Sequence, residues 1–349
     1  MAKLKNKIHL KELQPLDYDE LDSWWRTVPG ARRFTGEIMK AIDKHCATAA
    51  HLPKEDEAGF LQILTEKIQR KYVSLTIEIF DYEGKGDAED FVDALTSQFA
   101  PNFLRDFTKD SAFEDLAQQN SFAGYVLIVK LKNKIKWLTN AVADFNKNIS
   151  VEGGALIFLT TEDNPPPNIL RLSDFLTPYD IQFFAFNLLE STRLTLQQKL
   201  YTATLAAKLS GQSALLAKNL AKADLYIYGA DFVKTVIKNF DENFFNRAVW
   251  TCQAQFLLPA LEHIRSEIIE KNYVQLESIL PKKDEFGKKL NEPYDMELRH
   301  LHHYGGNEKI FPYDEWEILE MAYYARNSLS HLQLIELPEL EKIFNFAED

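Results

Sequence analysis

The strongest constraint on the fold is an alternation of short apolar runs and helix-like stretches that begins near residue 32 and ends near residue 190. Aliphatic and aromatic residues dominate five runs, at Ala47–Leu52, Val73–Phe80, Tyr125–Leu131, Ala155–Thr160 and Ile181–Leu188. Helix-like stretches lie between them, at Arg32–His45, Ala58–Lys71, Ala88–Gln98 and Asn133–Asn148. Near-continuous apolar strands separated by helices predict a parallel sheet covered on both faces. We therefore expect a three-layer α/β domain over residues 1–190.

Only helical patterns follow from Leu194 onward. Three short stretches predict a helical lid or linker over residues 191–240, at Leu194–Leu209, Gln212–Ala223 and Ala230–Asn239. Residues 241–349 predict an all-α helical bundle of three helices, at Phe244–Tyr273, Tyr313–Leu334 and Leu337–Phe346. Pro259 predicts a kink or break in the first of these helices, and Asp314 is the expected N-cap of the second. A polar hinge is expected at Pro281–Pro293.

Composition limits the class of protein. The chain has 349 residues, 46% hydrophobic and 26% charged, which is typical of about two globular domains. Its net charge of −12 disfavours an extended basic face for nucleic acid but leaves room for a local phosphate site. Residues 236–349 are the more acidic part, with 12 Lys and Arg against 21 Asp and Glu.

The sequence carries no targeting or membrane signal that we recognise. The start of the chain is basic but lacks the apolar stretch of a signal peptide, and no apolar run is long enough to span a bilayer. Cys46 and Cys252 fit neither a disulfide nor a metal pattern and indicate a reducing compartment. We expect a cytoplasmic protein that does not contact membranes.

A parallel sheet followed by a helical lid suggests the layout of a P-loop NTPase, but the residues for its chemistry are missing. The turn after the first run, residues 51–59, has a single glycine, and Glu55, Asp56 and Glu57 would repel a triphosphate. The third run continues into Lys130, where a carboxylate would be needed to hold Mg²⁺. The Gly84-Lys85 step has no Ser or Thr after it and is typical of a turn. We expect no nucleotide hydrolysis, no cofactor and no metal.

A family resemblance agrees with this expectation. Trp25, Pro29-Gly30, a helix and a short strand ending at Leu52-Pro53 resemble the opening of inactive STAND-type domains, over roughly residues 20–235. Such domains are degenerate relatives of signalling NTPases and lie beside effector domains in bacterial conflict systems. The resemblance implies a sensing or protein-interaction role for this part of the chain.

The most specific chemical signal lies in the segment Arg326-Asn327-Ser328-Leu329-Ser330-His331. A metal-free ribonuclease needs a group that titrates near neutrality to take the ribose 2′-OH proton, and a permanent cation to stabilise the phosphorane. Asn327 and His331 are four residues apart and share one helical face. Arg326 lies about 140° around the helix from His331. A second copy that brings its own Arg and His across a cleft would complete the arrangement, so the spacing predicts a dimeric site.

The C-terminal block resembles a HEPN domain, a helical bundle whose ribonuclease members carry Arg-polar-x3-His in this form. The resemblance covers about residues 240–349 and also includes Trp250-x2-Gln253, Leu258–Glu262, Arg265 and Asp295-x-Glu297-Leu298. It implies metal-independent RNA cleavage that leaves a 2′,3′-cyclic phosphate. It also implies that Arg326 stabilises the transition state, His331 is the acid and base, Asn327 is a polar helper, and Glu262 orients Arg326.

The same resemblance implies a toxin or effector that acts on RNA in antiphage defence, with homodimerisation through the C-terminal helices and a possible partner defence protein. Two other classes stay open. One is a non-catalytic adaptor that dimerises or docks on a partner effector, and the other is a nucleotide-driven switch, for which we expect no ATP affinity. Arg326 could also be structural, paired to Glu320 or Glu262, with His331 capping its helix.

Two further clusters have simpler interpretations. The run Arg299-His300-Leu301-His302-His303-Tyr304 has three histidines, but their spacing does not converge on a metal, so we expect a polar helix face or the rim of an RNA site. Trp24 and Trp25 lack neighbouring basic residues and are expected to be core and interface anchors, not a base-stacking platform.

Overall fold

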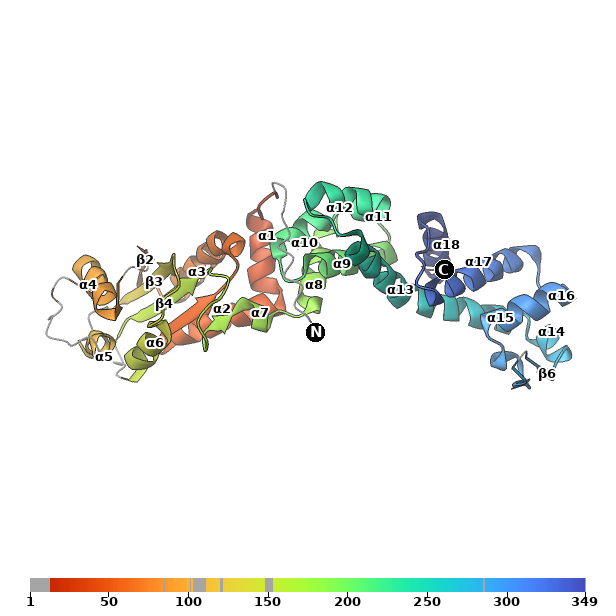
Figure 1. Ribbon diagram of the computed structural model, residues 1–349, viewed down its shortest axis with the longest axis horizontal. Coiled ribbons are helices and arrows are strands. Elements are labelled where there is room, and N and C mark those ends of the chain that lie inside the picture. The colour runs from red at the N-terminus through yellow and green to blue at the C-terminus, as the bar shows by residue number, and fades with distance from the viewer. Residues whose placement is uncertain are drawn as a thin grey trace. The chain divides into compact units, whose positions relative to one another are not determined.

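The computed structural model in Figure 1 describes residues 13–83, 86–100, 102, 111–119, 122–147, 153–284 and 286–348. The chain divides into two compact units, which are described separately. One comprises Leu13–Phe184 with Ser210–Asn219, and the other comprises Ala185–Leu209 with Leu220–Asp349. The basic start of the chain and the Gly84-Lys85 step lie outside the described residues. The boundaries near residues 190 and 240 stay predictions.

A five-stranded parallel sheet forms the centre of the first unit, with the strand order β2-β3-β4-β1-β5. Its strands are β1 (Ala47–His51), β2 (Thr76–Tyr82), β3 (Tyr125–Leu131), β4 (Ala155–Thr160) and β5 (Leu170–Arg171). Every residue of β4 is buried, which explains its uninterrupted apolar sequence. The register pairs Leu131 with Thr160 and Thr160 with His51, so the carboxyl ends of three strands lie level.

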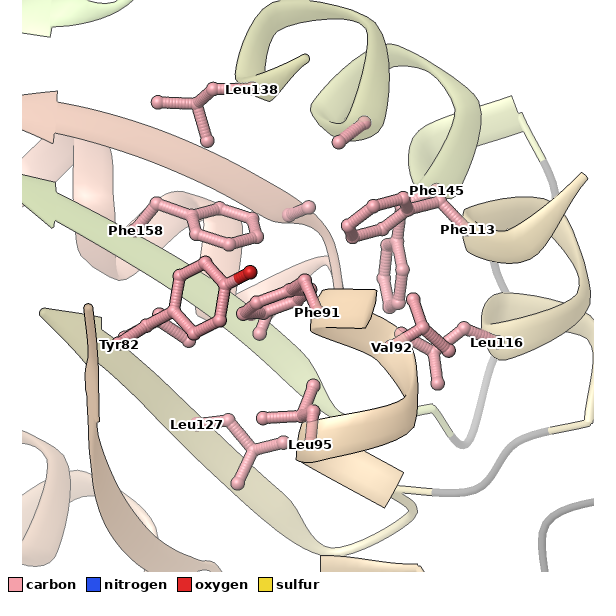
Figure 2. Close-up of a cluster of buried hydrophobic side chains, with 14 of the residues drawn as sticks. Tyr82, Phe91, Val92, Leu95, Phe113, Leu116, Leu127, Leu138, Phe145 and Phe158 are labelled. Carbon is pink, nitrogen blue, oxygen red and sulfur yellow. The ribbon is translucent and has the colours of Figure 1, made fainter. Parts of the chain in front are cut away.

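One face of the sheet is covered by α4 (Ala88–Phe99), α5 (Ala112–Gln118) and α6 (Leu138–Lys147). Aromatic rings fill this layer, as Figure 2 shows. The ring of Phe91 stacks on that of Phe113 at 5.7 Å and lies 5.6 Å from that of Phe158, a β4 residue. Burial of these rings joins the helices to the sheet.

The other face is covered by α2 (Pro29–Asp43) and α3 (Glu57–Lys71). The chain crosses from β1 to β2 in the direction opposite to the crossovers from β2 to β3 and from β3 to β4. Because such crossovers are right-handed, opposite directions place their helices on opposite faces of the sheet. Trp24 and Trp25 are fully buried, which confirms that they are core residues. They lie in a π-helical turn, Ser23–Thr27, that follows α1 (Tyr18–Asp22). The Trp25 ring lies 4.9 Å from Phe60 of α3. The prediction of a three-layer α/β unit is thus confirmed.

One predicted strand is wrong. Ile181–Leu188 belongs to the helix α8 (Pro178–Leu188), and the fifth strand is the two-residue β5, which precedes α7 (Leu172–Phe175). Ile181, Phe184 and Ala185 are buried whereas Phe183 is 44% exposed, which is the i, i+3, i+4 pattern of a helix. A short apolar run is equally compatible with a buried strand, and so its sequence was ambiguous.

The rest of the chain is mostly helical, as predicted. It contains α9 (Leu196–Ser210), α10 (Ala214–Leu220), α11 (Ala223–Tyr228), α12 (Ala230–Val236), α13 (Glu242–Lys271), α14 (Tyr273–Ser278), α15 (Leu298–His300), α16 (Gly306–Glu308), α17 (Tyr313–Ser330) and α18 (Leu337–Glu348). The predicted break at Pro259 is wrong, since α13 continues through it. The N-cap of α17 is Pro312 and not Asp314. The predicted hinge contains a small antiparallel hairpin, β6 (Lys282–Lys283) and β7 (Lys289–Leu290).

Two polar side chains of α13 form hydrogen bonds that hold the end of α17 and the segment after it. The indole Nε1 of Trp250 donates to the carbonyl of Leu329 at 3.0 Å. The buried amide of Gln253 donates to the carbonyl of Ile335 and accepts from its N–H, both at 2.8 Å. Within the described ranges, no helix is both long enough and apolar enough to cross a bilayer.

Candidate functional site

The carboxyl ends of the strands, where open α/β sheets bind ligands, carry a pocket of about 550 Å³ filled with opposed charges. The Nζ of Lys130 lies 2.8 Å from a carboxylate oxygen of Glu57 and 3.4 Å from one of Asp81. The hydrogen bond to Glu57 is the main reason that the pKa of Lys130 is raised. Since protein carboxylates already neutralise this lysine, it is a poor partner for a nucleotide phosphate.

In the loop between β1 and α3, Asp56 is packed into the protein whereas Lys54 and Glu55 are exposed. Asp56, which precedes α3, is 3% exposed, and its Oδ2 has no hydrogen-bond partner in the part of the chain that the structure describes. Burial, and then the neighbouring charge of Glu55, raises the pKa of Asp56 to about 7. A loop that must accommodate a buried carboxyl differs from the open cradle of backbone N–H groups that a triphosphate requires.

The three residues of the predicted ribonuclease motif lie at the C-terminal end of α17. Arg326 and His331 are exposed, and Asn327 is half-buried. His331 is the C-cap residue, and its N–H donates to the carbonyls of Asn327 and Ser328, both at 3.1 Å. The intervening Leu329 is buried and receives the hydrogen bond from Trp250 described above. The contacts of Leu329 therefore fix the backbone of α17 from which the side chain of Arg326 extends into solvent.

Arg326 lines a groove of about 490 Å³ within the second unit. Leu258, Leu261 and Glu262 of α13 also line it, together with Lys288 and the segment from Tyr294 to Leu298. His331 is not one of the lining residues. The motif thus presents Arg326 toward the groove and His331 elsewhere on the surface, as expected from their separation around the helix.

Glu262 contacts a different arginine from the one expected. Its Oε1 accepts from Nε of Arg265 at 2.8 Å, and Arg265 also donates to the carbonyl of Met296 at 2.9 Å. Arg265 thereby fixes the segment that forms one wall of the groove. Across the ranges described above, Arg326 forms no ion pair with Glu262 or Glu320, so its guanidinium is available to an anion.

The histidine run of residues 300–303 has packing roles. His300 is buried, with its Nε2 at 3.6 Å from a carboxylate oxygen of Asp284. His302 stacks between Tyr323 at 4.2 Å and Trp316 at 5.0 Å, and burial lowers its pKa. Among described residues, no group of three or more His, Cys, Asp or Glu is placed to hold a metal ion.

Sequence reasoning missed two contributors to the groove. It noted Arg265 only as part of a family pattern, and it treated Lys288 as part of a hinge. The only available signal was the spacing of four lysines around Gly287, which is compatible with a hairpin turn.

Comparisons with known proteins add no family. No family model matches the chain, and no curated protein sequence matches it. Solved structures with some similarity include the Drosophila ORC bound to DNA, at 12% identity and a TM-score of 0.34, with 98% of this chain and 96% of that chain covered. The Aeropyrum pernix ORC2 protein gives 10% identity and a TM-score of 0.30, with 99% and 96% covered.

A third similar structure is Rhizobiales Trip13, at 12% identity and a TM-score of 0.30, with 68% of this chain and 86% of that chain covered. Values this low support no conclusion about function. The resemblance of residues 240–349 to HEPN domains stays a prediction.

Proposed function

We propose that this chain is a metal-independent endoribonuclease of the toxin or effector type, regulated by an α/β unit that is a degenerate NTPase-like domain. The observation that supports this most is the solvent exposure of Arg326 and His331. Both are solvent-exposed at the end of a helix that Trp250 and Gln253 hold in place. Arg326 forms no ion pair with Glu262 or Glu320 among the described residues, as a structural arginine would, whereas His331 is the C-cap residue of α17. The assignment to antiphage defence rests on the family resemblance alone.

The chemistry follows from the two side chains. Neutral His331 accepts the proton of a ribose 2′-OH, and the 2′ oxygen then attacks the adjacent phosphorus. The bond from phosphorus to the 5′ oxygen breaks, and that oxygen takes a proton from the imidazolium of a second His331. The products are a 2′,3′-cyclic phosphate and a 5′-hydroxyl. Arg326 stabilises the added negative charge on the phosphorane oxygens, and Asn327 supplies a hydrogen bond.

The second histidine comes from a second copy of the chain. Because Arg326 lines the groove and His331, the C-cap residue of α17, does not, a single copy presents them poorly to one phosphate. Two copies related by a two-fold axis can place the arginine of one opposite the histidine of the other. The proposed enzyme is therefore a homodimer through its C-terminal helices.

The direct test is an RNA cleavage assay in EDTA with the full chain. Arg326→Ala and His331→Ala should each lower the rate by about 100-fold or more, because each removes a transition-state interaction. The matched controls are Arg247→Ala and His263→Ala, which change exposed residues of α13. Cleavage that the first two variants leave intact would contradict the proposal.

A non-catalytic adaptor is the second candidate, and one observation favours it. Tyr324 is 55% exposed and Leu332 is 70% exposed, on either side of the motif. Apolar side chains in such positions are common where a partner docks. The adaptor role predicts that no RNA is cut under any condition, and so the same assay separates the two candidates.

A further inference from the structure

The hairpin of β6 and β7 gathers positive charge in the more acidic part of the chain. Its two strands and turn carry Lys282, Lys283, Lys288 and Lys289. The register places Lys283 directly opposite Lys289. Like charges in directly opposed positions of an antiparallel pair repel each other. Such an arrangement becomes favourable when an anion lies between the two ammonium groups.

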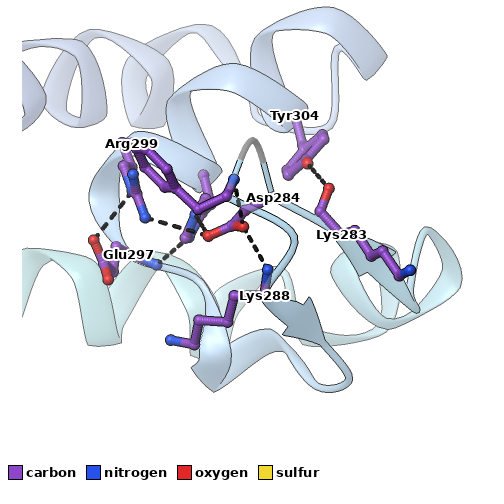
Figure 3. A network of polar contacts seen from close by, with 8 residues as sticks. Lys283, Asp284, Lys288, Glu297, Arg299 and Tyr304 are labelled. Carbon is purple, nitrogen blue, oxygen red and sulfur yellow. Dashed lines mark hydrogen bonds and ion pairs between the residues drawn. The ribbon is translucent and has the colours of Figure 1, made fainter.

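A buried carboxylate holds this hairpin in one conformation. Asp284 accepts from the N–H groups of Phe286 at 2.9 Å and Lys288 at 2.8 Å, which fixes the turn. Arg299 and His300, from α15, lie 3.4 Å and 3.6 Å from its Oδ2. Figure 3 shows the contacts of Arg299 and Lys288 with Asp284.

The charge of Asp284 is maintained within this network. Burial by itself raises the pKa of this carboxyl, but the hydrogen bonds from Lys288 and Phe286 and the nearby cations lower it overall. Tyr304 adds a hydrogen bond from its hydroxyl to the carbonyl of Lys283 at 3.0 Å (Figure 3). The lysine side chains therefore extend from a backbone that is anchored at both strands.

Three of the four lysines are available to a ligand. Lys282 is occupied, since its Nζ lies 3.3 Å from Glu308 and 4.6 Å from the centre of the Tyr304 ring. Lys283, Lys288 and Lys289 are exposed, and none of them forms an ion pair with another described residue. Lys288 lines the same groove as Arg326. Glu262, Asp295 and Glu297 line that groove as well, and Arg326 and Lys288 are the two lining cations for which the described residues provide no ion pair.

We propose that the hairpin is the anchor for the RNA backbone, and that a single strand lies along the groove from Arg326 to the β6–β7 lysines. This inference rests on the proposed function. One phosphate contacts Arg326, and further phosphates contact Lys288 and the opposed pair Lys283 and Lys289. Tyr294, which is 46% exposed at the groove, offers a ring on which an unpaired base can stack. Stacking of this kind requires a single strand.

The test measures binding, separately from cleavage. The probe is a fluorescent single-stranded RNA with 2′-O-methyl groups, which has no free 2′-OH and so cannot be cut. Its affinity for the full chain is measured in EDTA over a range of salt concentrations. The variant is Lys283→Ala with Lys289→Ala. The matched control is Lys234→Ala with Lys238→Ala, which removes two exposed lysines elsewhere in the same unit.

The hairpin variant should bind roughly tenfold more weakly at low salt, and the slope of log affinity against log salt should fall by about 1.4, for two lost phosphate contacts. The control should bind as the wild type does. Because the change removes a repulsive pair, the thermal midpoint of unfolding should not fall. An unaltered affinity and slope in the hairpin variant, or no salt-dependent binding by the wild type, overturns the inference.

Other outcomes are also decisive. If RNA is cut through Arg326 and His331 but the hairpin variant binds normally, the inference fails and the ribonuclease proposal stands. If the hairpin variant loses binding but no RNA is cut, the anchor stands and the ribonuclease fails. A polyglutamate of equal charge that binds as tightly as the RNA would overturn the assignment to nucleic acid, since an acidic protein would then fit equally well.

Discussion

At the scale of single residues, the sequence predicts the chemistry of the motif but not its surroundings. Arg326, Asn327 and His331 could be singled out because their side chains suit phosphodiester cleavage. The pairing of Glu262 with Arg265 is an i, i+3 ion pair on one helix, which their spacing alone indicates. The contact of Arg265 with the carbonyl of Met296 depends on tertiary structure, and no local pattern encodes it.

Asp56 gives a prediction for stability against pH. Its pKa is about 7 in the folded protein and ordinarily 3.8, so the folded state binds the proton more tightly than the unfolded state. Stability should therefore fall as the pH rises from about 4 to about 7 and then level off, with a loss of up to about 4 kcal/mol. Asp56→Asn should remove this part of the pH dependence, measured by urea denaturation between pH 5 and 8.

The matched control for this experiment is Asp19→Asn, an exposed carboxylate in the first turn of α1. It should retain the slope of the wild type. If Asp56→Asn and the wild type lose stability equally with rising pH, then the pKa of Asp56 is not raised by folding, which would contradict this prediction.

At the scale of helices and strands, the sequence predicted the boundaries correctly where the residues of a strand are buried on both faces of the sheet. The strands β3 and β4 have the predicted boundaries, because uninterrupted burial gives an uninterrupted apolar run. β2 begins later than predicted, and Val73, assigned to it from its side chain, is 96% exposed. β5 and the β6–β7 hairpin are two residues per strand and leave no periodic signal. These short elements are set by their neighbours.

The contact between α13 and the segment after α17 gives a second prediction. Gln253→Ala removes both hydrogen bonds to the buried backbone of Ile335, and should lower the free energy of unfolding by about 2–4 kcal/mol. The measurement is urea denaturation of the full chain. Gln255→Ala, at an exposed position of the same helix, should change it by less than about 0.5 kcal/mol. Equal losses in the two variants would show that Gln253 does not maintain this contact.

At the scale of the whole molecule, the proposed function depends on local departures from the average charge. The chain carries a net charge of −12, yet Arg326 and Lys288 of the hairpin line a single groove and form no ion pair with another described residue. The net charge disfavours a broad basic face for nucleic acid but leaves room for a local phosphate site, and the proposed contact in the groove is limited to a few phosphates. Self-association is the property of the whole molecule on which the proposed chemistry depends.

Mixing of inactive variants tests this dependence. If the site is shared between two copies, Arg326→Ala and His331→Ala should be inactive alone, but should regain part of the activity when they are mixed and allowed to exchange subunits. A mixed dimer still contains one Arg326 and one His331, from different copies. It lacks the second His331 that protonates the 5′ oxygen, so only part of the activity should return. The rate of RNA cleavage in EDTA measures the recovery. A mixture as inactive as its parts, with a wild type that sediments as an active monomer, would rule out a shared site.

The central claim is that a 2′-OH of the substrate is the nucleophile, with Arg326 and His331 as the groups that assist it. The measurement that addresses it most directly is mass spectrometry of the RNA fragments produced by the full chain in EDTA. We predict fragments that end in a 2′,3′-cyclic phosphate and begin with a 5′-hydroxyl, and no fragments from the His331→Ala variant. Fragments with a 5′-phosphate and a 3′-hydroxyl, or cleavage only when a divalent metal is added, would contradict the account.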